Sequence, residues 1–86
     1  MKPRAEKPNP HELAARERKS ARLVLLIEDL AEGTPHSPLE VFARLTPEQW
    51  IQMSVVIGQR KPSVPSAATQ LVILGYLRER MEGAAA

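Results

Sequence analysis

The chain has 86 residues, of which 43% are hydrophobic and only 3% aromatic, and it contains no cysteine. This length allows one domain, which buries only roughly 60–65% of its unfolded surface. The hydrophobic content is too high for a fully disordered chain. The absence of cysteine excludes disulfides and thiolate metal sites. The predominance of aliphatic over aromatic residues favours a helical bundle over a β-sandwich.

The net charge of +2 hides an uneven distribution of charge along the chain. Residues 1–22 contain seven basic and three acidic side chains, whereas residues 23–86 contain five basic and seven acidic ones. We predict a disordered basic arm at residues 1–8, one helical domain at residues 9–82 and a disordered tail at residues 83–86. No secretory signal is recognisable at the start, and no apolar run approaches the length of a membrane span. These features predict a cytoplasmic protein without a membrane partner.

Helix starts are marked by a repeated pattern of a capping residue, proline, any residue, and then Glu or Gln. The matches are Asn9-Pro10-His11-Glu12, Ser37-Pro38-Leu39-Glu40 and Thr46-Pro47-Glu48-Gln49. The capping side chain accepts a hydrogen bond from a free backbone N–H of the first turn. Proline suits the first helical position, and the Glu or Gln side chain reaches back to the capping amide. Recurrence of the pattern before apolar segments predicts three helix starts.

The predicted fold is an all-α, three-to-four-helix bundle of helix-turn-helix type with a flexible N-terminal arm. Helices are expected at residues 10–31, 38–45, 47–57 and 66–81, with Gly58 as the C′ residue of the third. Residues expected to face the core follow helical spacing. They are Leu23, Leu26, Ile27 and Leu30 in the first helix, Leu39, Phe42 and Leu45 in the second, Trp50, Met53 and Ile57 in the third, and Ala67, Leu71, Leu74 and Leu77 in the fourth.

The first and last predicted helices have more apolar residues than one buried stripe requires. Val24 and Leu25 lie beside the stripe of the first helix, and Val72, Ile73 and Tyr76 lie beside that of the last. One interpretation is a last helix that is buried on nearly all sides. The other is an exposed patch centred on Val24, Val72, Ile73 and Tyr76 that docks a partner protein or a second copy. On the second interpretation, glutamate at position 72 or 73 abolishes partner binding and leaves the helices intact.

Residues suited to catalysis are sparse and scattered. His11 and His36 lie beside prolines at helix starts, where a solvated turn residue is expected. Glu28, Asp29 and Glu32 come closest to an acidic cluster and are read as a solvated face. The sequence has no phosphate-binding loop, nucleophile elbow, or zinc or calcium motif. We therefore predict a protein without catalytic residues, metal, cofactor or small-molecule substrate.

DNA binding is an alternative function, carried by the third and fourth predicted helices as a helix-turn-helix. Ser66, Thr69 and Gln70 are residue types that reach base edges, and Arg60 and Lys61 could hold phosphates. The connection is longer than the compact turn of the motif, and Ser66 and Thr69 also suit a helix cap. The slightly acidic body offers little counterion release.

A second DNA-binding alternative is a ribbon-helix-helix dimer, because residues 39–82 resemble that family's strand–helix–helix layout. The resemblance implies that Glu40, Phe42 and Arg44 face the major groove. A carboxylate and a phenyl ring suit phosphate-lined DNA poorly. The Ser-Pro-Leu-Glu pattern also favours a helix for this segment.

Another resemblance concerns three segments that look like a degenerate helix-turn-helix regulator. These segments are residues 47–50, 58–63 and 76–80. They are similar to small anti-activators of bacterial conjugative elements, which occupy a transcription activator instead of an operator. This resemblance implies a bacterial regulator that binds a transcription regulator protein. Trp50 and Phe42 are then either binding hot spots or core anchors. Our leading hypothesis is transcription regulation through protein–protein contact, and a homodimer remains open.

Overall fold

The computed structural model describes the backbone of residues 10–85 and the side chains of residues 17–83. It contains the helices α1 (Pro10–Ala31), α2 (Pro38–Arg44), α3 (Pro47–Val56) and α4 (Ala67–Ala85), with no strand among the described residues. The all-α class is confirmed. The predicted arm at residues 1–8 and the first capping residue, Asn9, lie outside the described residues.

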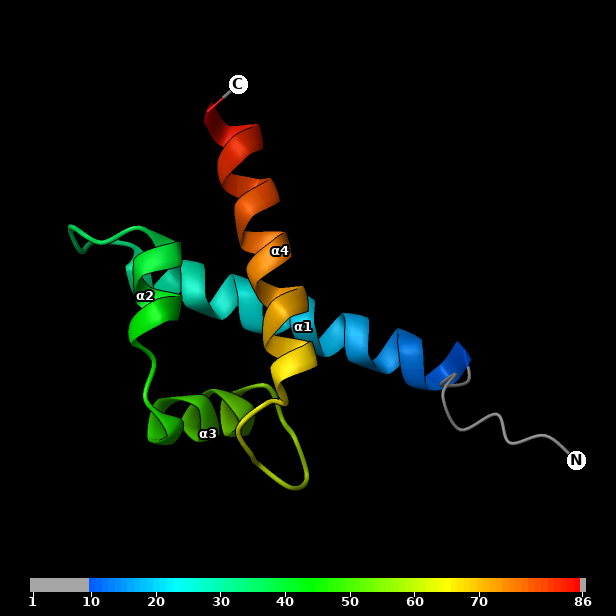
Figure 1. Ribbon diagram of the computed structural model, residues 1–86. Helices are drawn as coiled ribbons and strands as arrows, with labels where there is room; N and C mark the ends of the chain where they lie inside the picture. The colour runs from blue at the N-terminus through cyan, green and yellow to red at the C-terminus, as the bar shows by residue number, and fades with distance from the viewer. Residues whose placement is uncertain (1–9, 86) are drawn as a thin grey trace, which may run out of the picture.

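Helix α1 is the central element of the bundle. Among the described helices it alone contacts the other three, and α2 also contacts α4. Figure 1 shows α4 crossing α1, with the N-terminal turns of α1 projecting beyond the other helices. The smallest dimension of the molecule is 18 Å, less than two helix diameters of about 10–12 Å each. Each helix therefore keeps one side open to solvent.

The core forms where α1, α3 and α4 meet. Its fully enclosed members are Leu23 and Ile27 of α1 and Ile73 and Leu77 of α4. Trp50, Met53 and Ile57 are also buried, as predicted, and Leu39, Phe42 and Leu45 pack partly buried against this cluster. The rings of Phe42 and Trp50 meet edge to face with centroids 5.8 Å apart. Trp50 is thus a core anchor and has no exposed surface for a partner.

The predicted buried faces of α1 and α4 are partly wrong. Leu30 is 47% exposed and Leu71 is 67% exposed, whereas Val24 and Ile73 are buried. The reason in α4 is rotation: residues six apart, such as Leu71 and Leu77, point about 120° away from each other around a helix. Ile73 and Leu77 are four apart and share the face that meets α1.

Helix α2 begins with a complete capping box. The Ser37 hydroxyl accepts a hydrogen bond from the Glu40 N–H at 3.2 Å, and the Glu40 carboxylate accepts one from the Ser37 N–H at 2.8 Å. Thr46 and Gln49 repeat the box at α3, with distances of 3.2 and 2.9 Å. Because residues 38–44 are helical, the ribbon-helix-helix alternative, with Glu40, Phe42 and Arg44 on a strand, is wrong.

The α3–α4 connection is longer than a tight helix-turn-helix turn. Gly58 adopts φ +83° as the predicted C′ residue, and the Ser54 hydroxyl donates to the Ser63 carbonyl at 2.9 Å. Among the described residues, no Cα atom of α3 lies within 8 Å of α4. The helix-turn-helix type of the bundle is therefore not confirmed.

The C-terminal end of α4 lies beyond its predicted position. The helix continues to Ala85 instead of ending near residue 81, so residues 83–85 belong to it and not to a tail. Alanine is the strongest helix former, and one glycine, Gly83, costs only about 1 kcal/mol within a helix. A single glycine without a following proline is therefore insufficient to end α4.

Truncation of Ile73 tests the corrected core. We expect Ile73→Ala to lower the free energy of unfolding by about 2–5 kcal/mol, because the side chain is fully enclosed. Leu71→Ala, on the exposed side of the same helix, is the matched control and should change it by less than about 0.5 kcal/mol. Urea denaturation followed by circular dichroism measures both. Equal losses in the two variants would contradict the assigned faces.

The capping box of α2 should make stability depend on pH. The hydrogen bond from the Ser37 backbone N–H lowers the pKa of Glu40 in the folded chain. Folded chains therefore bind this proton less readily than unfolded ones, so the contribution is present at neutral pH and is lost as the pH falls through the lowered pKa. Glu40→Gln retains a capping side chain and should show a smaller loss of stability between pH 7 and 3. If the urea midpoints of the wild type and of Glu40→Gln change with pH in the same way, this role is refuted.

Candidate docking surface

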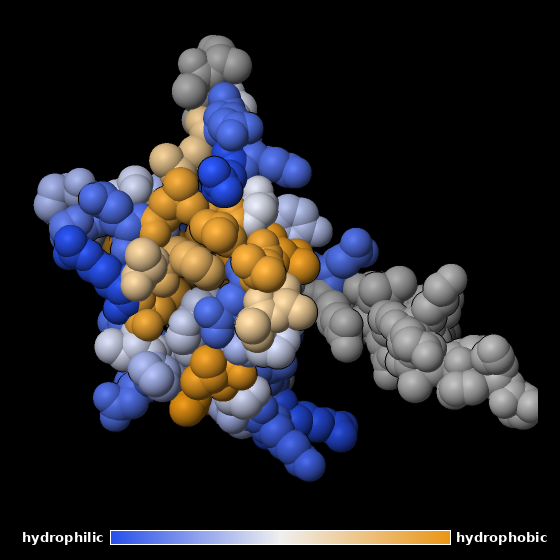
Figure 2. All heavy atoms as spheres, viewed as in Figure 1, coloured by the Kyte–Doolittle hydropathy of each residue, from blue (hydrophilic) through white to orange (hydrophobic). Residues whose placement is uncertain are grey.

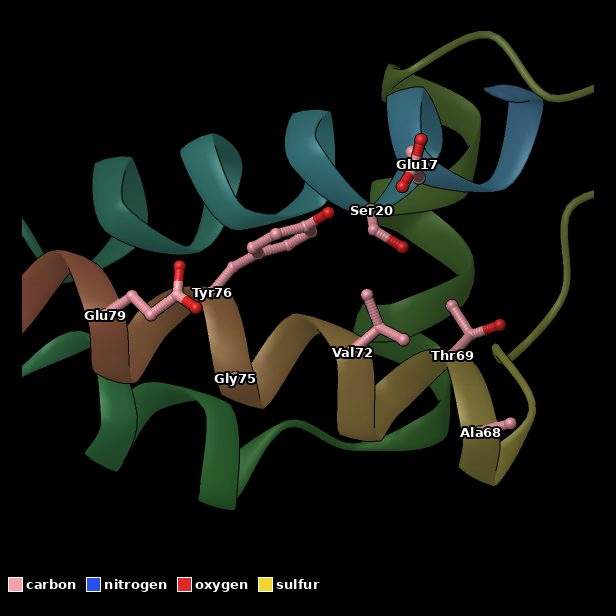
Figure 3. A pocket seen from close by; sticks show the side chains of 8 residues that line it. All are labelled: Glu17, Ser20, Ala68, Thr69, Val72, Gly75, Tyr76 and Glu79. Atoms are coloured by element: carbon pink, nitrogen blue, oxygen red, sulfur yellow. The ribbon is translucent and has the colours of Figure 1, made fainter. Parts of the chain in front are cut away.

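A groove of about 380 Å³ runs between α1 and α4 (Figure 3). It is lined by Glu17 and Ser20 from α1, and by Ala68, Thr69, Val72, Gly75, Tyr76 and Glu79 from α4. A second hollow of about 290 Å³ shares Tyr76 and Glu79 with it and is also lined by Ala21, Val24, Leu25 and Arg80. The two hollows together form one surface, which we call the α1–α4 groove.

Tyr76 is the central residue of the groove. Its ring extends from α4 toward α1, and Val72 lies one turn before it on the same wall (Figure 3). Tyr76 packs partly buried against the core, while Val72 is 45% exposed. The groove therefore has an aromatic and aliphatic wall with Glu17 and Glu79 among its lining residues.

An ion pair between Arg80 and Glu28 lies at one end of the α1–α4 groove. The guanidinium Nε and a terminal nitrogen donate to the two carboxylate oxygens at 2.5 and 2.9 Å. This hydrogen bond raises the pKa of Arg80. Arg80 is 53% exposed and Glu28 is 26% exposed, so the pair links α4 to α1 but adds little to the free energy of folding.

The outward side of α4 is apolar over its first turns. Figure 2 shows hydrophobic side chains gathered over this part of α4 and extending toward α2. Leu71 and Val72 are large and exposed, and Ala67, Ala68 and Gly75 beside them are also exposed. We call these five residues the α4 face. Contiguous apolar surface of this kind marks a site of interaction more often than scattered single residues do.

Gly75 has no role in packing within the described residues. A Cβ atom placed on it would meet nothing within 4 Å. Glycine in the middle of a helix costs roughly 0.5–1 kcal/mol relative to alanine. The fold therefore neither requires this glycine nor gains stability from it.

Two residues of the predicted partner-binding patch, Val72 and Tyr76, line the surface, and the other two, Val24 and Ile73, are buried. Val72 and Tyr76 line the α1–α4 groove. Val24 is only 3% exposed and contributes to its floor. Ile73 is fully enclosed in the core, so it cannot contact a partner, and glutamate there is expected to unfold the chain. Leu71, which the sequence analysis assigned to the core, takes its place on the surface.

The residues predicted to contact nucleic acid do not form a reading surface. The Ser66 hydroxyl accepts from the Thr69 N–H and donates to the Thr69 hydroxyl, which caps α4. Gln70 donates to the Pro65 carbonyl at 2.9 Å. Arg60 and Lys61 are exposed on the preceding loop. Ala67 and Ala68, which are exposed at this end of α4, offer no side-chain hydrogen-bonding groups to base edges.

A group of basic side chains beside α3 was not foreseen from the sequence. Arg18, Lys19 and Arg22 of α1 line a hollow of about 210 Å³ with residues 57–59 at the end of α3. The carbonyl end of a helix has a partial negative charge that nearby cations stabilise. This arrangement places three cations near the carbonyl end of α3. Spacing within the helix could have revealed that Arg18 and Arg22 share a face, but not which element they meet.

His36 Nδ1 lies 3.8 Å from the Glu40 carboxylate, beside the α2 cap, and the side chain of His11 lies outside the described residues. Within residues 17–83 no three histidine or carboxylate side chains converge as metal ligands. None of the described helices has the length and apolar character needed to cross a membrane.

Substitution of Gly75 tests whether the stability of the fold depends on glycine at this position. Gly75→Ala should raise the free energy of unfolding by about 0.5–1 kcal/mol, because the position is helical and open. Gly33→Ala is the matched contrast and should destabilise the chain, because Gly33 has φ +82°. Urea denaturation of both variants at low protein concentration provides the measurement. Destabilisation by Gly75→Ala would show a packing role that the structure lacks.

No model of a protein family matches the chain, and no curated protein or solved structure matches it.

Proposed function

We propose that this chain is a non-enzymatic regulatory module that acts on transcription by binding a regulator protein. The observation that carries the proposal is the α4 face beside the α1–α4 groove. Leu71 and Val72 are 67% and 45% exposed, and no described element covers them. The similarity of residues 47–50, 58–63 and 76–80 to small anti-activators supports the transcriptional role.

The shape of the surface favours an amphipathic helix as the bound segment. A helix can lay an apolar stripe along Val72 and Tyr76 in the α1–α4 groove. Glu17 and Glu79 come from opposite walls of the groove and offer negative charge to the flanks of that helix. We therefore expect a partner helix with aliphatic residues on one side and Lys or Arg beside them.

The free energy available from burial of Leu71 and Val72 is modest. Complete burial of an aliphatic side chain contributes about 1.5–3 kcal/mol. Weighted by their exposed fractions, Leu71 and Val72 together contribute about 2 kcal/mol, which is roughly 30-fold in Kd. Loss of one such side chain to a charged residue should therefore be readily measurable.

DNA binding is less well supported by the same region. The α4 residues that would enter a major groove include Ala67, Ala68 and Leu71, which cannot read bases through hydrogen bonds. Ser66, Thr69 and Gln70 already have partners within the chain. Arg60 and Lys61 remain available for phosphates, but phosphate contacts alone give no sequence preference.

Val72→Glu is the variant that tests the proposal. Tagged wild-type chain is cross-linked and recovered from the native host, and bound proteins are quantified by mass spectrometry. We expect a transcription regulator to be enriched with the wild type and reduced at least about 10-fold with Val72→Glu, because a carboxylate replaces a buried apolar contact. Unfolding in urea verifies that the variant is folded.

Val55→Glu is the matched control for this experiment. Val55 is a valine of similar exposure, 57%, on α3 and outside the α4 face. It should leave capture of the regulator unchanged. A gel shift with genomic fragments at two salt concentrations provides the opposing test. A sequence-specific shift at physiological salt, together with unchanged capture by Val72→Glu, would overturn the proposal in favour of operator binding.

A further inference from the structure

We propose that the α4 face also binds a second copy of the chain, with the two α4 helices antiparallel about a two-fold axis between Leu71 and Val72. This inference rests on the proposed function only in treating the α4 face as a docking surface. It names one occupant of that surface, an identical chain. Because both partners need Leu71 and Val72, self-association and regulator binding exclude each other.

The antiparallel register matches residue sizes across the axis. With the axis between positions 71 and 72, Leu71 of one copy lies opposite Val72 of the other. The same register places Ala68 opposite Gly75. These two small residues are one heptad apart on an exposed helix face, which is the spacing at which helices approach closely. Gly75, unexplained by the fold of one chain, thereby gains a packing role.

The charges at the two ends of the α4 face also favour the antiparallel arrangement. Arg60 and Lys61 precede the face and contribute +2, all of it exposed. Arg78, Glu79, Arg80 and Glu82 follow the face and sum to zero, from two positive and two negative charges. An antiparallel pair brings each basic end toward a neutral end, whereas a parallel pair would place the two basic ends side by side, where they repel each other.

Self-complementarity is the property that a two-fold interface requires, since the same patch forms both sides. An unrelated partner needs no match between one end of the α4 face and the other. The face has only five residues, in the first turns of α4, whereas stable interfaces have roughly 20–30 residues a side. We therefore expect a weak dimer that forms at high micromolar concentration and dissociates on dilution.

Engineered cysteines test the geometry, because the chain contains no cysteine of its own. In Leu71→Cys the two thiols lie next to the axis, so mild oxidation should produce a disulfide-linked dimer. Ala68→Cys and Gly75→Cys should each cross-link poorly alone but form a mixed disulfide when combined. Arg78→Cys places its two Cα atoms about 20 Å apart along the helix axes and should remain monomeric.

Two outcomes of the cross-linking overturn the proposal. One is an oxidised Leu71→Cys chain that stays monomeric at high protein concentration. The other is an Arg78→Cys chain that cross-links as fast as Leu71→Cys, which indicates parallel pairing or random collision. The variants are compared at equal concentration, and their disulfides are reduced again to verify the folded state of the monomers.

Analytical ultracentrifugation of the unmodified chain separates this inference from the proposed function. The wild type and Val55→Glu should rise from 9.6 kDa toward twice that mass with concentration, and Leu71→Glu should stay monomeric. A wild type that is monomeric throughout overturns the inference, even where Val72→Glu loses the regulator. A concentration-dependent dimer that Leu71→Glu abolishes supports it, even where capture of the regulator is unaffected by Val72→Glu.

Discussion

The structure depends on the crossing of α1 by α4, where Ile73 and Leu77 pack against Leu23 and Ile27. These four side chains are completely enclosed, although the molecule is only 18 Å thick in one direction. Helix α3 completes the core with Trp50 and its neighbours, and α2 covers one edge. The crossing sets which side of α4 is buried, and so which side is left as the α4 face. Docking surface and core are thus opposite sides of one helix.

Helix positions were predictable because the signals that start them are local. Ser37 with Glu40, and Thr46 with Gln49, form the expected boxes, since each needs only residues three apart in sequence. Gly58 likewise ends α3 as expected. These features need no knowledge of tertiary contacts. The same local signals favoured a helix over a strand at residues 39–45, in agreement with α2.

The faces of α4 were harder to predict, because apolar residues occur on almost every side of this helix. The predicted stripe combined Leu71, Leu74 and Leu77. Each of these residues is three positions after the one before it, so their directions drift around the helix and do not share a single face. The spacing of four between Ile73 and Leu77 is the one that tertiary packing selected. Sequence analysis therefore found the surplus of apolar surface and the groove residues Val72 and Tyr76. It placed Leu71 in the core and Ile73 on the surface, which is the reverse of the structure, because only the contact with α1 determines which of the two is buried.

The hydrogen bond from the Ser54 hydroxyl to the Ser63 carbonyl affects which changes in loop length the chain can tolerate during evolution. Hydrogen bonds hold both ends of the segment between Gly58 and Ser63, and among the described residues no Cα atom of α3 lies within 8 Å of α4. Insertions or deletions at residues 60–62 would lengthen or shorten a surface loop at little entropic cost. Relatives of this chain could therefore differ greatly in that loop and still hold the last helix at the same angle.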